Sequence, residues 1–284
     1  MKIYKLICLG CSFILPMNVQ ASDVWFGQLE QGGIVQGKAL GYSKIKIGER
    51  NFTVDKNGDF LLAFEREAPH GLSVSLEKAN GEIEQKVLSI KPIKWDVQKI
   101  NGIPQKKVTP PAEDRLAIED ERKQVREAVA ILTDNSYWKN GFMQPTKGRI
   151  SGKFGGQREM NGRKMNPHNG TDIAAPVGTP VLVAGDGEVV LVAKNLFYTG
   201  NVVIVNHGYG LHTIYAHLNE IIAKQGQKVK KGDLIGKVGK TGRVSGPHLH
   251  WGATLNGLRF NPFTLLSLNN SEKTVQIVDG FTKK

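Results

Sequence analysis

The C-terminal half of the sequence is patterned almost entirely as short β-strands, and this pattern limits the possible folds most. From residue 148 onward, short apolar runs alternate with glycines and turn residues, and no helical pattern separates them. The predicted strands are 149–154, 180–183, 187–193, 202–206, 211–217, 228–238 and 248–255. Regularly spaced short strands without helices between them are typical of an antiparallel sheet or sandwich. We therefore predict a mainly β fold with a C-terminal domain at 136–284 and its core at 148–265.

The N-terminal region is also predicted to be all-β. Alternating apolar runs occupy 33–39, 44–47, 51–54, 60–64, 72–77 and 83–90. Two of the turns between them contain Asn-Gly, at Asn57-Gly58 and Asn80-Gly81, which is the strongest short signal for a hairpin. His70 stands alone in a predicted turn and belongs to no catalytic pattern. Residues 22–100 therefore form a small all-β module whose expected role is packing, docking or covering.

A linker and a connecting helix are predicted for 101–135. Thr109 reads as the N-cap, with Pro110 at the first helical position and Glu113 and Asp114 in the first turn. The helical pattern runs to about Leu132, with an incomplete apolar stripe among many charges. We interpret it as a helix that lies across the surface of a domain.

The first 21 residues have the pattern of a secretory signal. Lys2 and Lys5 precede an apolar run at 6–15, and a small-residue cleavage site ends at Ala21. The run is too short to cross a bilayer permanently. We expect the exported chain to begin near Ser22.

Both cysteines, Cys8 and Cys11, lie inside this signal. The exported chain would then have no thiol, so any metal site would use nitrogen and oxygen ligands. Lipidation at Cys11 is the alternative, but Cys8 occupies a position where such a site prefers Leu. A soluble exported protein is the favoured interpretation.

Removal of Lys2 and Lys5 leaves 36 basic and 26 acidic residues, a formal charge of +10 (36 − 26). A basic exported protein suits a polyanionic partner, although the charge can equally serve solubility. Lysine and arginine are scattered through the sequence, and no nucleic-acid-binding motif accompanies them. We therefore predict no nucleic-acid partner.

Histidines gather in the C-terminal domain. In a strand, His248 and His250 face the same side, while Leu249 turns toward the core. His168 and Asp172 are four residues apart in a segment whose Pro167 and Gly170 favour a turn over a helix. Imidazole and carboxylate are zinc ligands, and a catalytic zinc keeps three protein ligands. The pattern predicts a zinc site with histidines to spare for proton transfer.

The remaining histidines were placed by strand parity. His217 shares parity with Tyr215, so the two are expected to face the same way, while His212 points elsewhere and is structural or exposed. His207 is interpreted as a hairpin-turn residue.

Several stretches match one known family. They are 154–155, 167–181, 200–204, 213–218, 229–233 and 246–250. With these stretches, residues 148–265 resemble the catalytic domain of the lysostaphin/LytM-type zinc endopeptidases, which cut peptidoglycan. Two departures from the family, Trp251-Gly252 after His250 and the polar insertion 157–165, affect the rim of the site and its substrate preference.

The resemblance implies a set of site residues. It implies that His168, Asp172 and His250 bind one zinc ion per chain, and that His217 and His248 are unliganded catalytic imidazoles. His248 would accept the proton of water, and His217 would hold the oxyanion or protonate the leaving amine.

We also assign Asn201 and Tyr215 to substrate binding.

The function implied is a zinc-dependent endopeptidase, most simply a DD-endopeptidase, acting on cross-links or stem peptides of peptidoglycan. The sequence shows no wall-sorting tail and no wall-binding repeats, which favours the periplasm of a Gram-negative cell over secretion. The N-terminal module is a candidate cover for the cleft that would keep the enzyme latent.

Two other functions compete with this one. Relatives that lost their ligands activate other wall hydrolases without being enzymes, and bound zinc would distinguish them from a peptidase. The segment 227–236 resembles the hammerhead of biotinyl and lipoyl carrier domains, but neither Lys237 nor Lys240 lies at a suitable hairpin tip.

Overall fold

The structure is a computed structural model that describes residues 24–268 and 274–276. The predicted signal at 1–21 and the expected start at Ser22 lie outside the described residues. No helix in the described part of the chain is long and apolar enough to cross a membrane.

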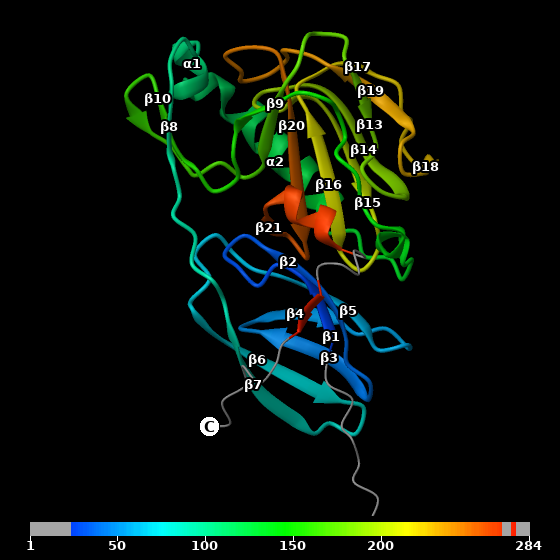
Figure 1. The fold of residues 1–284 in the computed structure, drawn as a ribbon. Coiled ribbons are helices and arrows are strands. Elements are labelled where there is room, and N and C mark those ends of the chain that lie inside the picture. Colours follow the sequence, from blue (N-terminus) through cyan, green and yellow to red (C-terminus); the bar gives the residue numbers. More distant parts are fainter. Residues whose placement is uncertain (1–23, 269–273, 277–284) are drawn as a thin grey trace, which may run out of the picture.

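The molecule has two tiers, with the N-terminal strands below and the C-terminal domain above (Figure 1). The lower tier contains two four-stranded sheets, ordered β22-β1-β2-β5 and β4-β3-β6-β7. Its strands are β1 (Val24–Gly27), β2 (Ile34–Lys38), β3 (Tyr42–Ile47), β4 (Arg50–Thr53), β5 (Asp59–Ala63), β6 (Gly71–Lys78), β7 (Ile83–Ser89) and β22 (Thr274–Gln276). The predicted Asn80-Gly81 hairpin joins β6 to β7, and Leu76 pairs with Glu84 in its ladder. The secondary structure from Val24 to Ser89 consists of β-strands only, and β1 is not among the strands expected from the sequence.

The connecting segment differs from the prediction. It contains β8 (Val97–Ile100), α1 (Gln105–Val108), a 3-10 turn at Ala112–Asp114, helix α2 (Arg115–Val129) and a second 3-10 turn at Tyr137–Asn140. Thr109 does not cap α2; its hydroxyl instead accepts a hydrogen bond from Arg163 at 2.7 Å. The helix starts later because Pro111 forces the preceding residue out of the helical region, so the chain stays extended through the Pro-Pro pair.

The polar insertion is also structured. Residues 157–164 form a hairpin of β10 (Gln157–Met160) and β11 (Arg163–Lys164), and β8 pairs with β10 in parallel. The linker strand thereby continues onto the C-terminal domain instead of passing freely over it.

The upper tier is built on an eight-stranded sheet with the order β18-β14-β15-β16-β20-β12-β9 and with β21 paired to β20. A smaller sheet, β13-β19-β17, packs against it. The strands are β9 (Arg149–Gly152), β12 (Thr171–Ala174), β13 (Pro180–Leu182), β14 (Gly187–Leu196), β15 (Gly200–Asn206), β16 (Leu211–Ala216), β17 (Leu218–Ile221), β18 (Lys228–Val229), β19 (Leu234–Val238), β20 (His248–Leu255) and β21 (Leu258–Phe260), followed by a 3-10 turn at Pro262–Ser267. The pairings within both sheets are antiparallel, as predicted.

The two faces of the large sheet bury different partners. On one face Val202, Ile204 and Ile214 pack against the apolar side of α2, including Val125. On the other face Tyr215, Trp251 and their neighbours form the main core with the smaller sheet. Alternation along each strand explains the division, because adjacent residues point to opposite faces.

The lower tier is docked on the upper one by specific contacts. Arg66 donates from Nε to the Gly155 carbonyl at 2.6 Å, and Trp95 meets Phe154 edge-on with ring centroids 6.0 Å apart. Lys139 forms salt bridges with two acids of the lower tier, Asp55 at 2.9 Å and Asp59 at 2.6 Å.

Candidate metal centre and its cavity

Strand register places a carboxylate and an imidazole opposite each other. Asp172 on β12 pairs with His250 on β20, so both side chains leave the sheet on the same face. The Oδ1 atom of Asp172 lies 2.8 Å from His250 Nδ1 and 3.0 Å from His168 Nε2. His168 Nε2 and His250 Nδ1 are 3.1 Å apart. These three residues form one compact donor group, in which every side chain is buried.

Glycines make the space for this group. His168 comes from the loop before β12, and its Nδ1 lies 3.1 Å from the Lys153 carbonyl, which fixes the ring with Nε2 facing the group. A side chain at Gly170 would approach His250 Nε2 to 2.6 Å, and one at Gly152 would approach Asp172 Oδ2 to 2.7 Å. Larger residues at either position would collide with the donor group.

Burial sets the protonation states. It lowers the pKa of His168 to about 4, although Asp172 opposes the shift, and it also lowers the pKa of His250. Burial alone would raise the pKa of Asp172, but His168 and His250 together outweigh it and hold that pKa well below its usual range. At neutral pH the group is therefore two neutral imidazoles and one carboxylate, the forms that bind a metal.

His217 and His248 lie beside the donor group. Their ring centroids are 4.8 Å apart, and the ring of His217 is 5.8 Å from that of His250. Nδ1 of His217 lies 2.8 Å from the Thr241 carbonyl, and Nδ1 of His248 lies 2.8 Å from the Gly246 carbonyl. Because a carbonyl can only accept, each Nδ1 carries the proton in the neutral ring and each Nε2 keeps a lone pair. The neutral ring of His217 therefore presents a proton acceptor at Nε2, and it could donate to an oxyanion or to a leaving amine only after Nε2 has accepted a proton.

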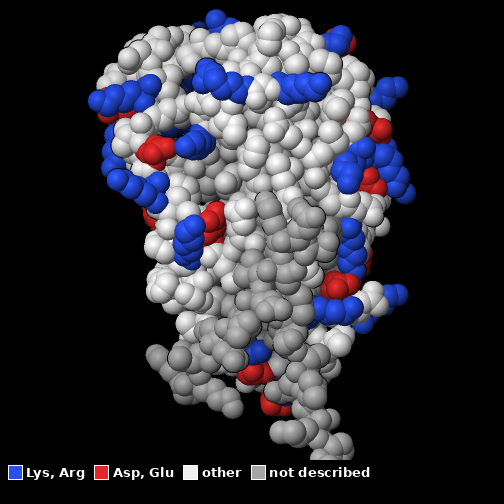
Figure 2. Space-filling view, viewed as in Figure 1, with Lys and Arg blue, Asp and Glu red and all other residues white. Residues whose placement is uncertain are grey.

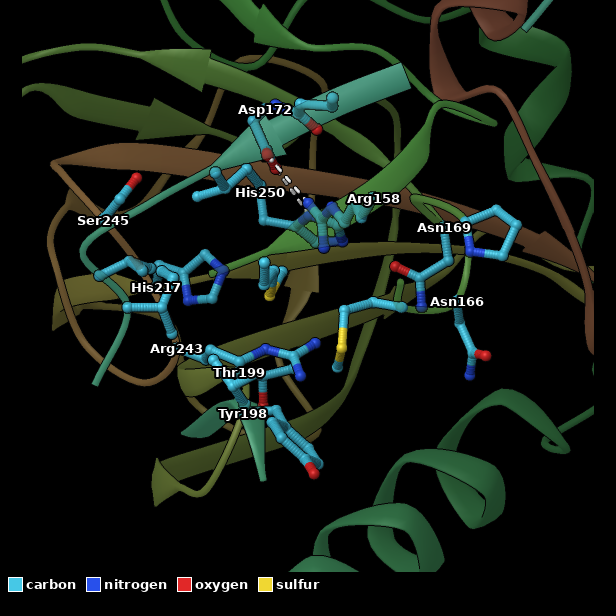
Figure 3. Close-up of a pocket in the computed structure, with 18 of the residues that line it drawn as sticks. Arg158, Asn166, Asn169, Asp172, Tyr198, Thr199, His217, Arg243, Ser245 and His250 are labelled. Atoms are coloured by element: carbon cyan, nitrogen blue, oxygen red, sulfur yellow. Dashed lines mark hydrogen bonds and ion pairs between the residues drawn. The ribbon is translucent and has the colours of Figure 1, made fainter. Parts of the chain in front are cut away.

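A local backbone feature aims His217 into the cavity. Its φ is 65°, in the left-handed region that non-glycine residues rarely adopt. This turn ends β16 and breaks the strand alternation, so His217 faces the cavity (Figure 3). Tyr215 instead belongs to the main core on the opposite side of the sheet. The expectation that His217 and Tyr215 face the same way is wrong for this reason.

The two residues assigned to substrate binding lie elsewhere. Tyr215 is fully buried, and its hydroxyl accepts a hydrogen bond from the Ala184 amide at 2.8 Å. Burial raises the pKa of that hydroxyl to about 12. Asn201 uses its Oδ1 to accept from the Asn195 amide at 3.0 Å, which closes the β14–β15 turn. Neither residue lines the cavity, so neither position fits direct contact with a substrate.

His207 and His212 do not belong to the donor group and do not line the cavity. His207 is fully buried, with Nδ1 2.6 Å from the Asp186 carbonyl and Nε2 2.7 Å from Thr213 Oγ1. His212 is also buried, with Nδ1 3.2 Å from the Gly210 carbonyl. Burial lowers the pKa of each to about 4. His212 is thus structural, and His207 contributes to the core as well as to the turn after β15.

Sequence reasoning missed an arginine at the metal centre. Arg158 on β10 donates from Nη2 to the second carboxylate oxygen of Asp172, Oδ2, at 3.1 Å. It belongs to the polar insertion 157–165, for which the sequence predicted only an effect on the rim of the site and on substrate preference. The signal that could have revealed the hairpin is Asn161-Gly162, the same dipeptide that marked the N-terminal hairpins.

A second missed residue comes from the connecting helix. Glu121 on α2 is buried, and its carboxylate accepts hydrogen bonds from the Tyr198 amide at 2.7 Å, the Thr199 amide at 3.0 Å and the Thr199 hydroxyl at 2.9 Å. The Thr199 carbonyl in turn accepts from the His217 amide at 2.9 Å. Helix α2 thus fixes the loop at Tyr198–Thr199, and this loop positions the backbone of His217. A lone Glu in a charged helix gives no sequence signal for this role.

Asp172, His250, His217 and His248 line one cavity of about 850 Å³, together with Arg158 and Glu121. Its walls come from the C-terminal domain, α2 and the linker, where Gln98 and Ile103 contribute. Of the predicted N-terminal module, only β8 reaches the cavity, and no residue of β1 to β7 lines it. On the face shown in Figure 2, lysine and arginine are spread over the upper tier without forming one patch.

The donor group fits zinc. Two neutral imidazoles and a carboxylate are a common ligand set for catalytic zinc, and an ideal tetrahedral site separates neighbouring donors by about 3.3 Å. The three donor separations, 2.8 to 3.1 Å, are within a few tenths of an ångström of that value. The second carboxylate oxygen and the second ring nitrogen of His168 already have partners that orient them.

The comparisons with known proteins agree with this arrangement. Residues 166–262 match the model of peptidase family M23. This match contains the donor group and both spare histidines. The upper tier is named after the match and is called the M23 domain below.

Curated relatives match mainly this domain. The chain is 47% identical over 117 residues to the peptidoglycan DD-endopeptidase ShyA of Vibrio cholerae, a match covering 41% of this chain and 27% of ShyA. It is 43% identical over 155 residues to ShyC of the same organism, covering 48% of this chain and 34% of ShyC. It is 42% identical over 117 residues to the DD-carboxypeptidase/endopeptidase Mpg of Neisseria meningitidis, covering 41% of this chain and 27% of Mpg. The chain thus spans about a third or less of the length of these relatives.

A solved structure shares more of the architecture. A Pseudomonas aeruginosa protein assigned to peptidase M23 superimposes with a TM-score of 0.66 at 25% identity, covering 84% of this chain and 96% of that one. The similarity therefore extends beyond residues 166–262.

Proposed function

We propose that this chain is an exported, zinc-dependent endopeptidase that hydrolyses peptide bonds of peptidoglycan, most simply the DD cross-link. One observation carries the proposal: a three-residue metal donor group borders one cavity through Asp172 and His250, and His217 and His248 line the same cavity with each Nδ1 held by a backbone carbonyl. The DD specificity rests on the relatives ShyA, ShyC and Mpg, whose names give DD activity to those proteins.

The residues of the site have separate roles in metal binding and in orienting the metal ligands. His168 Nε2, Asp172 Oδ1 and His250 Nδ1 would hold zinc, which supplies Lewis acidity toward the scissile carbonyl and lowers the pKa of bound water from about 15.7 to about 7. Arg158 orients Asp172 through its second oxygen.

The two spare imidazoles move the proton. His248 accepts a proton at Nε2 from the attacking water, which becomes bonded to the carbonyl carbon. That proton passes from Nε2 of His248 to Nε2 of His217, and His217 donates it to the leaving nitrogen as the C–N bond breaks, so both rings end neutral. His217 lies on the leaving-group side in this proposal. Burial and, second, His248 lower the pKa of His217 well below its usual value, which keeps the resting ring neutral and ready to accept.

The periplasm of a Gram-negative cell is the proposed location. The support is the sequence pattern of the first 21 residues and the wall-directed names of the relatives.

The test is digestion of purified peptidoglycan by residues 22–284 that have been loaded with zinc, with chelator-treated protein as the control. Loss of cross-linked peptides and appearance of their uncrosslinked halves, abolished by chelator and restored by zinc, is the expected result. A zinc-loaded protein that releases no peptide would contradict the proposal. A protein that binds no zinc would instead favour a non-enzymatic activator.

A further inference from the structure

The cavity of the M23 domain is strongly cationic. Seven lysines and arginines line it against two carboxylates, Glu121 and Asp172. Both carboxylates are already engaged, Glu121 with the Tyr198–Thr199 backbone and Asp172 with the imidazoles and Arg158. The excess positive charge in a concave site attracts an anionic ligand.

One arginine at the reacting end of this cavity forms no salt bridge among the described residues. The guanidinium of Arg243 lies over the ring of Tyr198, 4.4 Å from the centroid. Among the described residues, its recorded hydrogen bond is a long one, from Nη1 to the Lys107 carbonyl at 3.5 Å, and it forms no salt bridge. Stacking fixes the plane of the group and leaves most of its five N–H donors uncommitted.

Arg243 belongs to the same local framework as His217. Its amide donates to the Tyr198 carbonyl at 2.9 Å, and the Thr199 carbonyl accepts from the His217 amide at 2.9 Å. The Thr241 carbonyl, two residues before Arg243, accepts from the His217 ring at 2.8 Å. Two loops therefore fix both side chains, and both face the cavity (Figure 3).

The guanidinium of Arg158 lines the same cavity as that of Arg243. Burial first, and the neighbouring charge of Arg158 second, lower the pKa of Arg243. Arg158 is neutralised by Asp172, whereas Arg243 has no such partner among the described residues. An anion bound at Arg243 would offset both its burial and its repulsion from Arg158.

A DD peptide bond offers such an anion. Its leaving amine sits on a D-configured carbon that also carries a free carboxylate, whether that carbon belongs to a diamino acid in a cross-link or to the last residue of a stem peptide. We propose that Arg243 binds this carboxylate, next to the leaving amine, and so selects DD bonds. This inference rests on the proposed function, because it places the leaving amine beside His217. Arginine suits the task because its planar fork binds a carboxylate through two N–H donors.

The experiment pairs a change in the enzyme with a change in the substrate. Zinc-loaded residues 22–284 are given a peptide with a D-alanyl bond to a diamino acid whose adjacent carboxylate is free, and the same peptide with that carboxylate amidated. A second pair ends in D-alanyl-D-alanine, free or amidated, to distinguish the two sources of the carboxylate. The variants are Arg243→Met, which keeps the stacking volume, and Arg243→Lys, which keeps the charge. Arg149→Met, on the exposed strand β9 and outside the cavity, is the matched control.

We expect amidation to lower kcat/KM of the unaltered protein about 10- to 100-fold, mostly through KM. Arg243→Met should lose a similar factor on the free carboxylate and change less than about threefold on the amide, while Arg243→Lys should fall between. Arg149→Met should match the unaltered protein on every peptide. An equal loss on free and amidated peptides, or no effect of amidation on the unaltered protein, would overturn the proposal.

A binding measurement separates this inference from the proposed function. Calorimetry of the same peptides with the zinc-loaded His248→Ala protein needs no turnover. Tighter binding of the free carboxylate, lost in His248→Ala combined with Arg243→Met, supports Arg243 even if the unaltered protein hydrolyses none of the peptides. Equal binding of free and amidated peptides counts against Arg243 even if hydrolysis is observed.

Discussion

Histidines in the same sheet occupy opposite environments in this molecule. His217 and His250 line one cavity together with Asp172, and Nδ1 of His250 contacts the Asp172 carboxylate there. His207 lies on the other side of the sheet, where Asp186 and Thr213 engage both of its ring nitrogens. All three rings are buried and all have lowered pKa values, so burial and a shifted pKa do not by themselves mark a functional histidine. The distinguishing property is that the rings converge with a carboxylate and with one another on one open space.

The largest expected effect separates the two catalytic imidazoles from the metal donors. His217→Ala and His248→Ala should each lower kcat on peptidoglycan peptides about 10²- to 10⁴-fold, because each removes a proton acceptor that the reaction needs. Both proteins should still bind one zinc ion. Single-turnover rates with zinc analysis of the same samples would check this, and a variant that kept more than a tenth of the activity would not be catalytic.

His207 should matter for stability and not for chemistry. Its pKa is about 4 in the folded chain and about 6.5 in the unfolded one, so the unfolded chain binds more protons between these pH values. The stabilisation is therefore complete above pH 6.5 and is lost as the pH falls toward 4, by about 3 kcal/mol. His207→Gln should flatten this part of the profile. Denaturant titrations of both proteins in chelator, from pH 7 to 4, would measure it, and parallel profiles would refute the assignment.

Glu121 tests whether the connecting helix belongs to the site. Glu121→Ala removes the acceptor for two backbone amides of the loop that fixes His217. We expect kcat to fall about 10- to 100-fold with little change in KM and with zinc still bound. Glu119→Ala, exposed on the same helix, is the control. The circular dichroism spectrum at the assay temperature should match that of the unaltered protein.

The support that α2 gives to the site also changes the effect expected of truncating the chain to residues 136–284. If the N-terminal region only covered the cleft, residues 136–284 would be more active than residues 22–284. Because that truncation also removes Glu121 and the α2 packing surface, we expect lower activity. An increase in kcat on truncation would show that the N-terminal region inhibits the enzyme by covering the cleft more than α2 assists it by positioning the site.

Much of this arrangement could be predicted from short-range patterns. Period-two alternation located most strands, and the His248-x-His250 spacing placed two imidazoles on one face. These features are local, so the sequence contains them directly.

The failures share a different cause. The left-handed backbone of His217 overrides strand parity, and neither its neighbours nor its own side chain predicts that conformation. Arg158 and Glu121 reach the site only through pairing of β8 with β10 and packing of α2 on the sheet. Such contacts join segments far apart in the sequence, so no window of residues could reveal them.

The most direct test of the account is the zinc content of four matched proteins: unaltered residues 22–284, His250→Ala, His248→Ala and His207→Gln. After equilibration with equimolar zinc and removal of the excess, the account predicts one zinc ion per chain in all except His250→Ala, which should bind none. Zinc retained in His250→Ala but lost in His248→Ala would contradict the assignment of donors within the cavity. Zinc lost in His207→Gln, with the fold intact, would contradict the division between the two groups of histidines.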